Sequence, residues 1–187
     1  MISVVDVETS WQVTDTGGYD PSPYHPDNIL VSVGINDEYY FTNHSERIDD
    51  GCYHKIQSIL DKTTLLVGHN IKFDLMWLIE AGFKYTGKVY DTMLGEYILN
   101  RGIRKSLTLE MSCRRRRIGS KDNRIKEFTD RGIPFQNIPH NVVEEYGRMD
   151  VQITRDLFNS QMADFRMPKN KHLLMTAKMM NEFLIVL

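Results

Sequence analysis

Apolar residues in the first quarter of the chain occur in short runs that predict strands. The run Ile2–Val5 predicts a buried strand at the start of the sequence. Residues 29–35 and 39–42 predict two further strands, and Asn36-Asp37 between them suits a tight turn. We therefore expect an antiparallel meander to follow the first strand.

Helical spacing of apolar residues governs most of the remaining sequence. It predicts a C-terminal amphipathic helix and helices over residues 48–60, 71–81, 92–99, 107–118 and 141–165. Asp91 suits the N-cap position of the third of these helices. The short apolar runs 65–67 and 88–90 predict two more strands. Two polar segments, 11–27 with its three prolines and 119–139, are expected to be irregular.

This order of elements predicts an α/β layered domain with a mixed sheet. A doubly wound dinucleotide fold is excluded, because the first strands connect as hairpins and no Gly-rich phosphate loop occurs. The 187 residues fit a single domain, 1–187, and no interior linker marks a second one. No apolar run approaches the roughly 20 residues that a membrane span requires, so we expect no membrane partner.

Composition and charge narrow the classes of function. With 41% hydrophobic and 26% charged residues, the chain has the composition of a soluble globular protein. Two isolated cysteines, Cys52 and Cys113, and the lack of a basic leader predict free thiols in a reducing compartment. Residues 1–100 carry 6 Lys and Arg against 15 Asp and Glu, whereas residues 101–131 carry 11 against 4. This asymmetry suggests a cation site beside a groove for a polyanion, although a solvated basic helix has the same composition.

Two carboxylates, Asp6 and Glu8, follow the first apolar run. Side chains alternate along a strand, so these two acids point to the same side. Their mutual repulsion is relieved by a divalent cation between them, and Mg²⁺ and Mn²⁺ prefer such oxygen ligands. An isolated Asp-x-Glu pair is equally consistent with two solvated acids at a strand end.

Two later acids occupy informative positions on helices. Asp74 lies in the first turns of the helix over 71–81, where it points toward the strand ends or simply favours a helix N-terminus. Asp150 lies in mid-helix, where aspartate has poor propensity. Tyr146 is four residues before Asp150 and shares its helix face, so both could belong to one site or to an ordinary exposed surface.

Together these motifs resemble a known superfamily. The Asp-x-Glu pair, Asn70 four residues before Asp74, and Tyr146 four residues before Asp150 resemble the proofreading 3′–5′ exonucleases with an RNase H-like fold. The tyrosine, rather than histidine, is typical of the DEDDy subclass. Similarity to the exonuclease domain of family A (Pol I-type) DNA polymerases covers segments 67–70, 90–94, 145–150 and, where those polymerases enter the polymerase body, 180–187.

The resemblance implies a fold and a mechanism. The fold would be a three-layer RNase H-like α/β domain with a mixed five-stranded sheet flanked by helices. The reaction would be two-metal phosphodiester hydrolysis with Mg²⁺ or Mn²⁺, removing nucleoside monophosphates from DNA 3′ ends during replication proofreading. Asp6 would bridge both ions, Glu8 and Asp150 would complete the site of the attacking water, and Asp74 would hold the second ion. Tyr146 would orient the water.

The resemblance also implies contacts with a single-stranded DNA 3′ end. Asn70 is expected to contact the terminal nucleotides, and Phe73 either packs on a base or fills the core. Arg114 and Arg115 lie along the expected path of the strand or form a solvated helix end that complements the helix dipole. A separate polymerase subunit is a candidate partner, and the expected location is the cytoplasm of a bacterial or phage-infected cell.

Two alternatives remain at this stage. An RNase D-like exonuclease shares the tyrosine subclass but acts on RNA, and substrate preference distinguishes it. A degenerate exonuclease fold would bind nucleic acid without cutting it. The presence of all four acids and the tyrosine argues against the second alternative.

Overall fold

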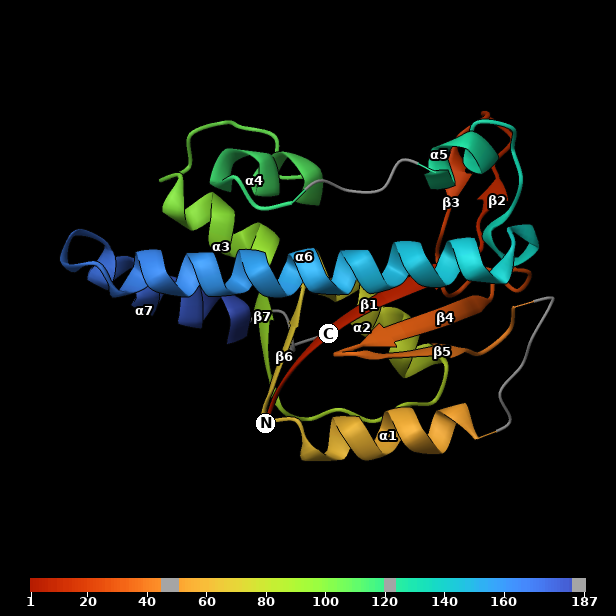
Figure 1. The fold of residues 1–187 in the computed structure, drawn as a ribbon, viewed down its shortest axis with the longest axis horizontal. Coiled ribbons are helices and arrows are strands. Elements are labelled where there is room, and N and C mark those ends of the chain that lie inside the picture. Colours follow the sequence, from red (N-terminus) through yellow and green to blue (C-terminus); the bar gives the residue numbers. More distant parts are fainter. Residues whose placement is uncertain (45–50, 120–123, 183–187) are drawn as a thin grey trace.

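A mixed five-stranded sheet forms the middle layer of the protein in the computed structural model, which describes residues 1–44, 51–119 and 124–182 (Figure 1). In spatial order its strands are β5 (Glu38–Phe41), β4 (Leu30–Ile35), β1 (Ile2–Thr9), β6 (Leu65–Gly68) and β7 (Lys88–Asp91). Strand β1 is therefore central. It pairs antiparallel with β4 and parallel with β6, and β5 and β7 extend the sheet antiparallel and parallel, respectively. The predicted meander and the α/β class with a mixed sheet are confirmed.

Helices cover both faces of the sheet. They are α1 (Cys52–Lys62), α2 (Ile71–Glu80), α3 (Thr92–Leu99), α4 (Leu109–Arg116), α5 (Arg124–Thr129), α6 (His140–Arg166) and α7 (Lys171–Glu182), with short 3₁₀ helices η1 (Phe135–Asn137) and η2 (Pro168–Asn170). Side chains alternate between the two faces of β1, so the hydrophobic core has a part on each face of the sheet. Val5 and Val7 pack with α1 and α2, whereas Val4 packs with α6 and α7. Asp91 caps α3 as predicted, and its side chain accepts from the Met93 amide.

Two segments that were expected to be irregular contain secondary structure. Segment 11–27 includes a small hairpin of β2 (Gln12–Val13) and β3 (Tyr19–Asp20), and segment 119–139 includes α5 and η1. The hairpin closes because the Gly17 amide donates to the Thr14 carbonyl with Gly17 at φ +78°, a left-handed conformation that glycine adopts at little cost. Helix α5 is held by Ile125, which packs into a small core with Phe41 and Val143. The first predicted helix begins at Cys52, and residues 45–50 lie outside the described residues.

Two glycines allow α6 to approach the sheet closely. A methyl group on Gly34 of β4 would lie 2.8 Å from Val151 Cγ2 of α6, and one on Gly147 of α6 would overlap the ring of Tyr39. The Tyr39 ring cannot easily move, because its hydroxyl bonds Ser32 Oγ at 2.8 Å and donates to the Val143 carbonyl at 3.3 Å. This contact sets the distance between α6 and the central strands.

Replacing Gly147 by alanine should destabilise the protein by about 1–3 kcal/mol, because overpacking at Tyr39 outweighs the better helix propensity of alanine. Activity should fall as well, since Tyr146 and Asp150 move with the helix. Urea unfolding measures the first effect. Gly119→Ala is the matched control, because a methyl group there meets no atom of the described residues within 4 Å. Equal stability of the two variants would contradict this account of the α6 contact.

Candidate active site

Three carboxylates converge above the central strand. Alternation along β1 points Asp6 and Glu8 toward the face that α6 covers, the same side as Val4. Helix α6 crosses this face and supplies Asp150, which is 3% exposed. One oxygen from each of these three acids lies within 4.8 Å of the other two. The structure therefore brings together residues that are up to 144 positions apart in the sequence.

Tyr146 belongs to the same cluster. Burial raises the pKa of the Tyr146 hydroxyl far above its usual value, and the charges of Glu8, Asp150 and Asp6 raise it further. A hydrogen bond between Tyr146 and Asp150 acts in the same direction, as expected for a hydroxyl that donates to a carboxylate. Tyr146 thus keeps its proton at neutral pH and acts as a hydrogen-bond donor beside the acids.

Asp74 reaches the cluster from the other side of β1. It lies in the first turn of α2, and its Oδ1 accepts from the Val7 amide at 3.0 Å. Asp74 is 3% exposed, and burial raises the pKa of its carboxyl well above the usual value, with the charge of Asp6 as the next cause. Within the described residues, Asp74 is not part of the set whose oxygens all lie within 4.8 Å, so it borders that set at Asp6.

This donor set fits divalent metal ions. Several carboxylates in a small, largely buried volume repel one another, and the raised pKa of Asp74 reflects that cost together with burial. Hard cations such as Mg²⁺ and Mn²⁺ bind carboxylate oxygens and would remove the repulsion. In the part of the chain that the structure describes, the cluster contains no thiolate or imidazole ligand that would favour a softer metal.

The start of α2 holds the site in place through contacts that the motif pattern does not predict. Asn70 adopts a left-handed conformation with φ +62°, and its amide donates to Asp91 Oδ1 at 2.9 Å. The Asp91 amide in turn donates to Asn181 Oδ1 of α7 at 2.7 Å. His69 lies 2.9 Å from both Thr92 Oγ1 and the Leu107 carbonyl. Helices α2, α3 and α7 are therefore linked at the end of the sheet that carries the acids.

The predicted nucleic-acid contacts occupy different environments. Asn70 is exposed, whereas Phe73 is half-buried and packs against the core, in line with the core alternative for that residue. Arg114 is exposed at the end of α4. Contact of these residues with nucleic acid stays a prediction.

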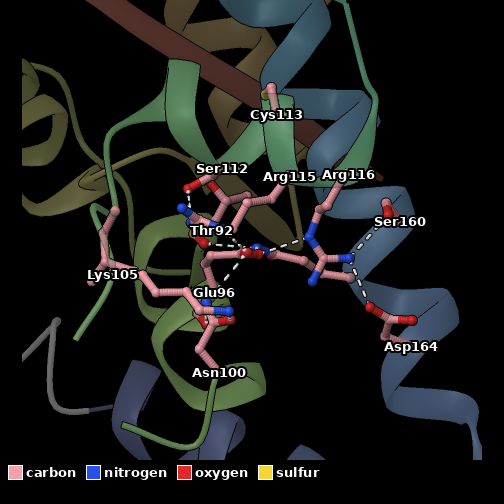
Figure 2. Close-up of polar contacts among 12 residues, drawn as sticks. Thr92, Glu96, Asn100, Lys105, Ser112, Cys113, Arg115, Arg116, Ser160 and Asp164 are labelled. Carbon is pink, nitrogen blue, oxygen red and sulfur yellow. Dashed lines mark hydrogen bonds and ion pairs between the residues drawn. The ribbon is translucent and has the colours of Figure 1, made fainter. Parts of the chain in front are cut away.

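The guanidinium of Arg115 has partners within the protein. It bonds Glu96 Oε1 at 3.2 Å, the Ser106 carbonyl at 2.6 Å and Ser112 Oγ at 3.0 Å (Figure 2). The neighbouring Arg116 bonds the same carboxylate through Glu96 Oε2. The basic run on α4 thus has an internal structural task that its sequence does not reveal, and an Arg115 contact with nucleic acid would compete with it.

The mixed five-stranded sheet with helices on both of its faces is that of an RNase H-like α/β domain. Over residues 14–163 the chain matches the family described as 3′–5′ exonuclease, of the family A DNA polymerase type. The chain belongs to this 3′–5′ exonuclease family. No match to a curated protein was found.

Solved structures of a bacterial and a trypanosomal protein have the same fold. NrnC of Brucella melitensis with bound Mg²⁺ superimposes with a TM-score of 0.67 at 14% identity, covering 98% of this chain and 81% of NrnC. NrnC bound to pGG gives a TM-score of 0.67 at 15% identity, covering 98% of this chain and 80% of NrnC. The catalytic core of RRP6 from Trypanosoma brucei gives 0.63 at 13% identity, covering 98% and 46% of the two chains. At these identities the likeness concerns the fold.

One further property concerns membranes. Within residues 1–44, 51–119 and 124–182, no helix combines the length and the apolar character needed to cross a bilayer.

Proposed function

We propose that the protein is a metal-dependent exonuclease that removes nucleoside monophosphates from the 3′ end of single-stranded DNA. The convergence of Asp6, Glu8 and Asp150 within 4.8 Å, with a protonated Tyr146 beside them, carries the proposal. Replication proofreading is the role that we assign to this activity, with a separate polymerase subunit as the candidate partner. Affinity would come from backbone electrostatics and base stacking rather than sequence readout.

Each residue has a distinct task in this reaction. Asp6, Glu8, Asp150 and Asp74 would hold two divalent ions, which lower the pKa of a bound water and stabilise the charge that develops at phosphorus. Asp6 has the central position among these acids, because it contributes to the group of three and its charge also acts on Asp74. Tyr146 orients the attacking water by a hydrogen bond, and its raised pKa excludes it as a general base near neutral pH.

The test uses a single-stranded DNA 12-mer labelled at its 3′ end, with Mg²⁺ or Mn²⁺ and with EDTA as the control. A labelled mononucleotide released first, only with metal, establishes both the activity and its polarity. Labelled fragments of intermediate length would indicate internal cleavage or digestion from the 5′ end, and either result would contradict the 3′–5′ exonuclease proposal. Tight binding of the 12-mer without cleavage in either metal would instead identify a non-catalytic binding module.

A second candidate substrate is RNA, as in RNase D-like enzymes. The specific observation in its favour is the NrnC structure bound to pGG, whose fold covers 98% of this chain. Measuring kcat/KM on DNA and RNA 12-mers of one sequence, and on 5′-phosphorylated dinucleotides, separates the candidates. A preference for DNA of about tenfold or more, which corresponds to about 1.4 kcal/mol in the barrier, would support the first proposal. A comparable preference for RNA would replace it.

A further inference from the structure

The segment that follows β1 carries aromatic side chains, the first of them three residues after Glu8. The segment leaves the sheet at Ser10, whose amide donates to the Ile29 carbonyl at 3.0 Å, and the Ile29 amide returns a hydrogen bond to Ser10 Oγ at 2.7 Å. Trp77 of α2 anchors the segment by donating from Nε1 to the Pro21 carbonyl at 3.1 Å. The β2–β3 hairpin is thereby tied to the sheet and to α2, and it stands beside α5 (Figure 1).

Trp11 and Tyr19 form an aromatic shelf on this hairpin. Their ring centroids are 4.4 Å apart and the rings meet edge to face at 72°. Tyr19 is 65% exposed, which is unusual for a ring that only serves packing. Together with Pro21 on the hairpin and Thr129 and Asp130 at the end of α5, they line a cavity of about 370 Å³.

The lining of this cavity suits a nucleobase better than a phosphate. Among the described residues, the cavity is lined by two aromatic rings, a proline, a hydroxyl and a carboxylate, and by no lysine or arginine. Aromatic rings stack on any base, and a carboxylate accepts a hydrogen bond from an exocyclic amino group. The α5 segment also carries exposed Lys126 and Arg131, which suit the phosphates on either side of a bound base.

The short chain between Glu8 and Trp11 limits the distance between the aromatic shelf and the acids. Trp11 is three residues after Glu8, and three residues of extended chain span at most about 11 Å. A base on the shelf would therefore belong to a nucleotide close to the bond that is cut.

We propose that Trp11 and Tyr19 form a base-stacking subsite for the single-stranded nucleic-acid substrate, an inference that rests on the exonuclease function proposed above. The subsite binds one base by stacking. Its contribution to affinity is non-ionic, in contrast to the contribution of the phosphate contacts.

Fluorescence anisotropy tests this inference with a 5′-fluorescein single-stranded DNA 12-mer in EDTA, where no cleavage occurs. Trp11→Ala and Tyr19→Ala should each weaken binding by about 5- to 150-fold, the range found for removing one stacking ring. The ratio between variant and wild-type Kd should stay constant between 50 and 200 mM salt while both affinities fall. Tyr24→Ala is the matched control, because Tyr24 is 69% exposed on the same segment but lines a different cavity, against α2.

Tryptophan fluorescence supplies a direct readout of stacking. The 12-mer should quench the emission of the wild-type protein, and Trp11→Phe should abolish the quenching, because the other tryptophan, Trp77, is 3% exposed. Thermal unfolding shows whether each variant is folded. If Trp11→Ala does not fold, the affinity of Tyr19→Ser for the 12-mer tests the subsite instead.

The two proposals fail in different ways. Wild-type affinity in both Trp11→Ala and Tyr19→Ala, with normal cleavage of the 12-mer in Mg²⁺, would overturn the subsite and leave the exonuclease function intact. Absence of cleavage of DNA and RNA by the wild-type protein would instead overturn the exonuclease function on which the subsite rests.

Discussion

Asp6→Ala should leave the protein folded and reduce phosphodiester hydrolysis about a thousandfold or more, which is about 4 kcal/mol or more in the barrier. The expected loss is large because Asp6 belongs to the group of three acids and its charge also acts on Asp74 and Tyr146. Without Asp6, neither proposed ion retains its full ligand set. Single-turnover cleavage of the 3′-labelled 12-mer in saturating Mg²⁺ measures the effect.

The same variant should be at least as stable as the wild type when no metal is present. Removing one anion relieves repulsion within a largely buried acidic cluster, so urea unfolding in EDTA should give an equal or higher free energy of unfolding. Mg²⁺ should then stabilise the wild type more than Asp6→Ala. A ligand that binds the folded state raises the free energy of unfolding, and the variant has lost one of the proposed ligands. Glu80→Ala, an exposed acid on α2, is the control and should change neither property. Unfolding of Asp6→Ala in EDTA would show that the acid is structural.

Glu96→Ala should destabilise the protein by about 3–5 kcal/mol, the usual cost of removing one partner from a buried ion pair. Glu96 is 3% exposed and accepts from Arg115, from Arg116 and from Gln161 Nε2, the last at 3.2 Å (Figure 2). Arg116 also bonds Asp164 Oδ2 at 2.7 Å. The carboxylate therefore joins α3, α4 and α6, and its loss leaves the Arg116 guanidinium largely buried without its principal partner. Chemical denaturation at pH 7 measures the change.

A double variant distinguishes lost pairing from lost packing. Glu96→Leu combined with Arg116→Met replaces both charges with apolar side chains, and such replacements of whole buried pairs are often neutral or stabilising. We expect the double variant to recover most of the stability that Glu96→Ala loses. If it is as unstable as Glu96→Ala, the charge network is not the cause.

The contribution of Glu96 should disappear in acid. Burial raises the pKa of the Glu96 carboxyl, but the hydrogen bond and charge of Arg116 outweigh burial and hold the pKa below its usual value. A carboxyl with a lowered folded-state pKa stabilises the protein above its unfolded pKa of about 4.3, and this stabilisation is lost as the pH falls through the folded pKa. The stability difference between wild type and Glu96→Gln should therefore narrow from pH 7 to about pH 3.

The predictions from local pattern were the most accurate. Alternation placed Asp6 and Glu8 on one side of β1, and the four-residue spacing placed Tyr146 and Asp150 on one face of α6. These inferences succeed because strand and helix geometry is set by the backbone within a few residues. The same holds for the N-cap at Asp91, whose capping contact is only two residues away.

Other features depended on contacts between distant segments. The sequence does not indicate that Arg115 and Arg116 pair with Glu96, about 20 residues away, because charged runs look alike whether solvated or buried. It also does not indicate the role of Gly147, which follows from the position of Tyr39 across the helix–sheet contact.

By itself the sequence determined the α/β class and the exonuclease family resemblance, and it predicted which acids form the proposed site, since each of these rests on local spacing and motif order. Only the tertiary structure decided that three of these acids meet within 4.8 Å and that the segment after β1 folds into an aromatic hairpin beside α5. The physical reason is that contacts between remote elements depend on side-chain packing and desolvation. These contacts leave no periodic signal along the sequence.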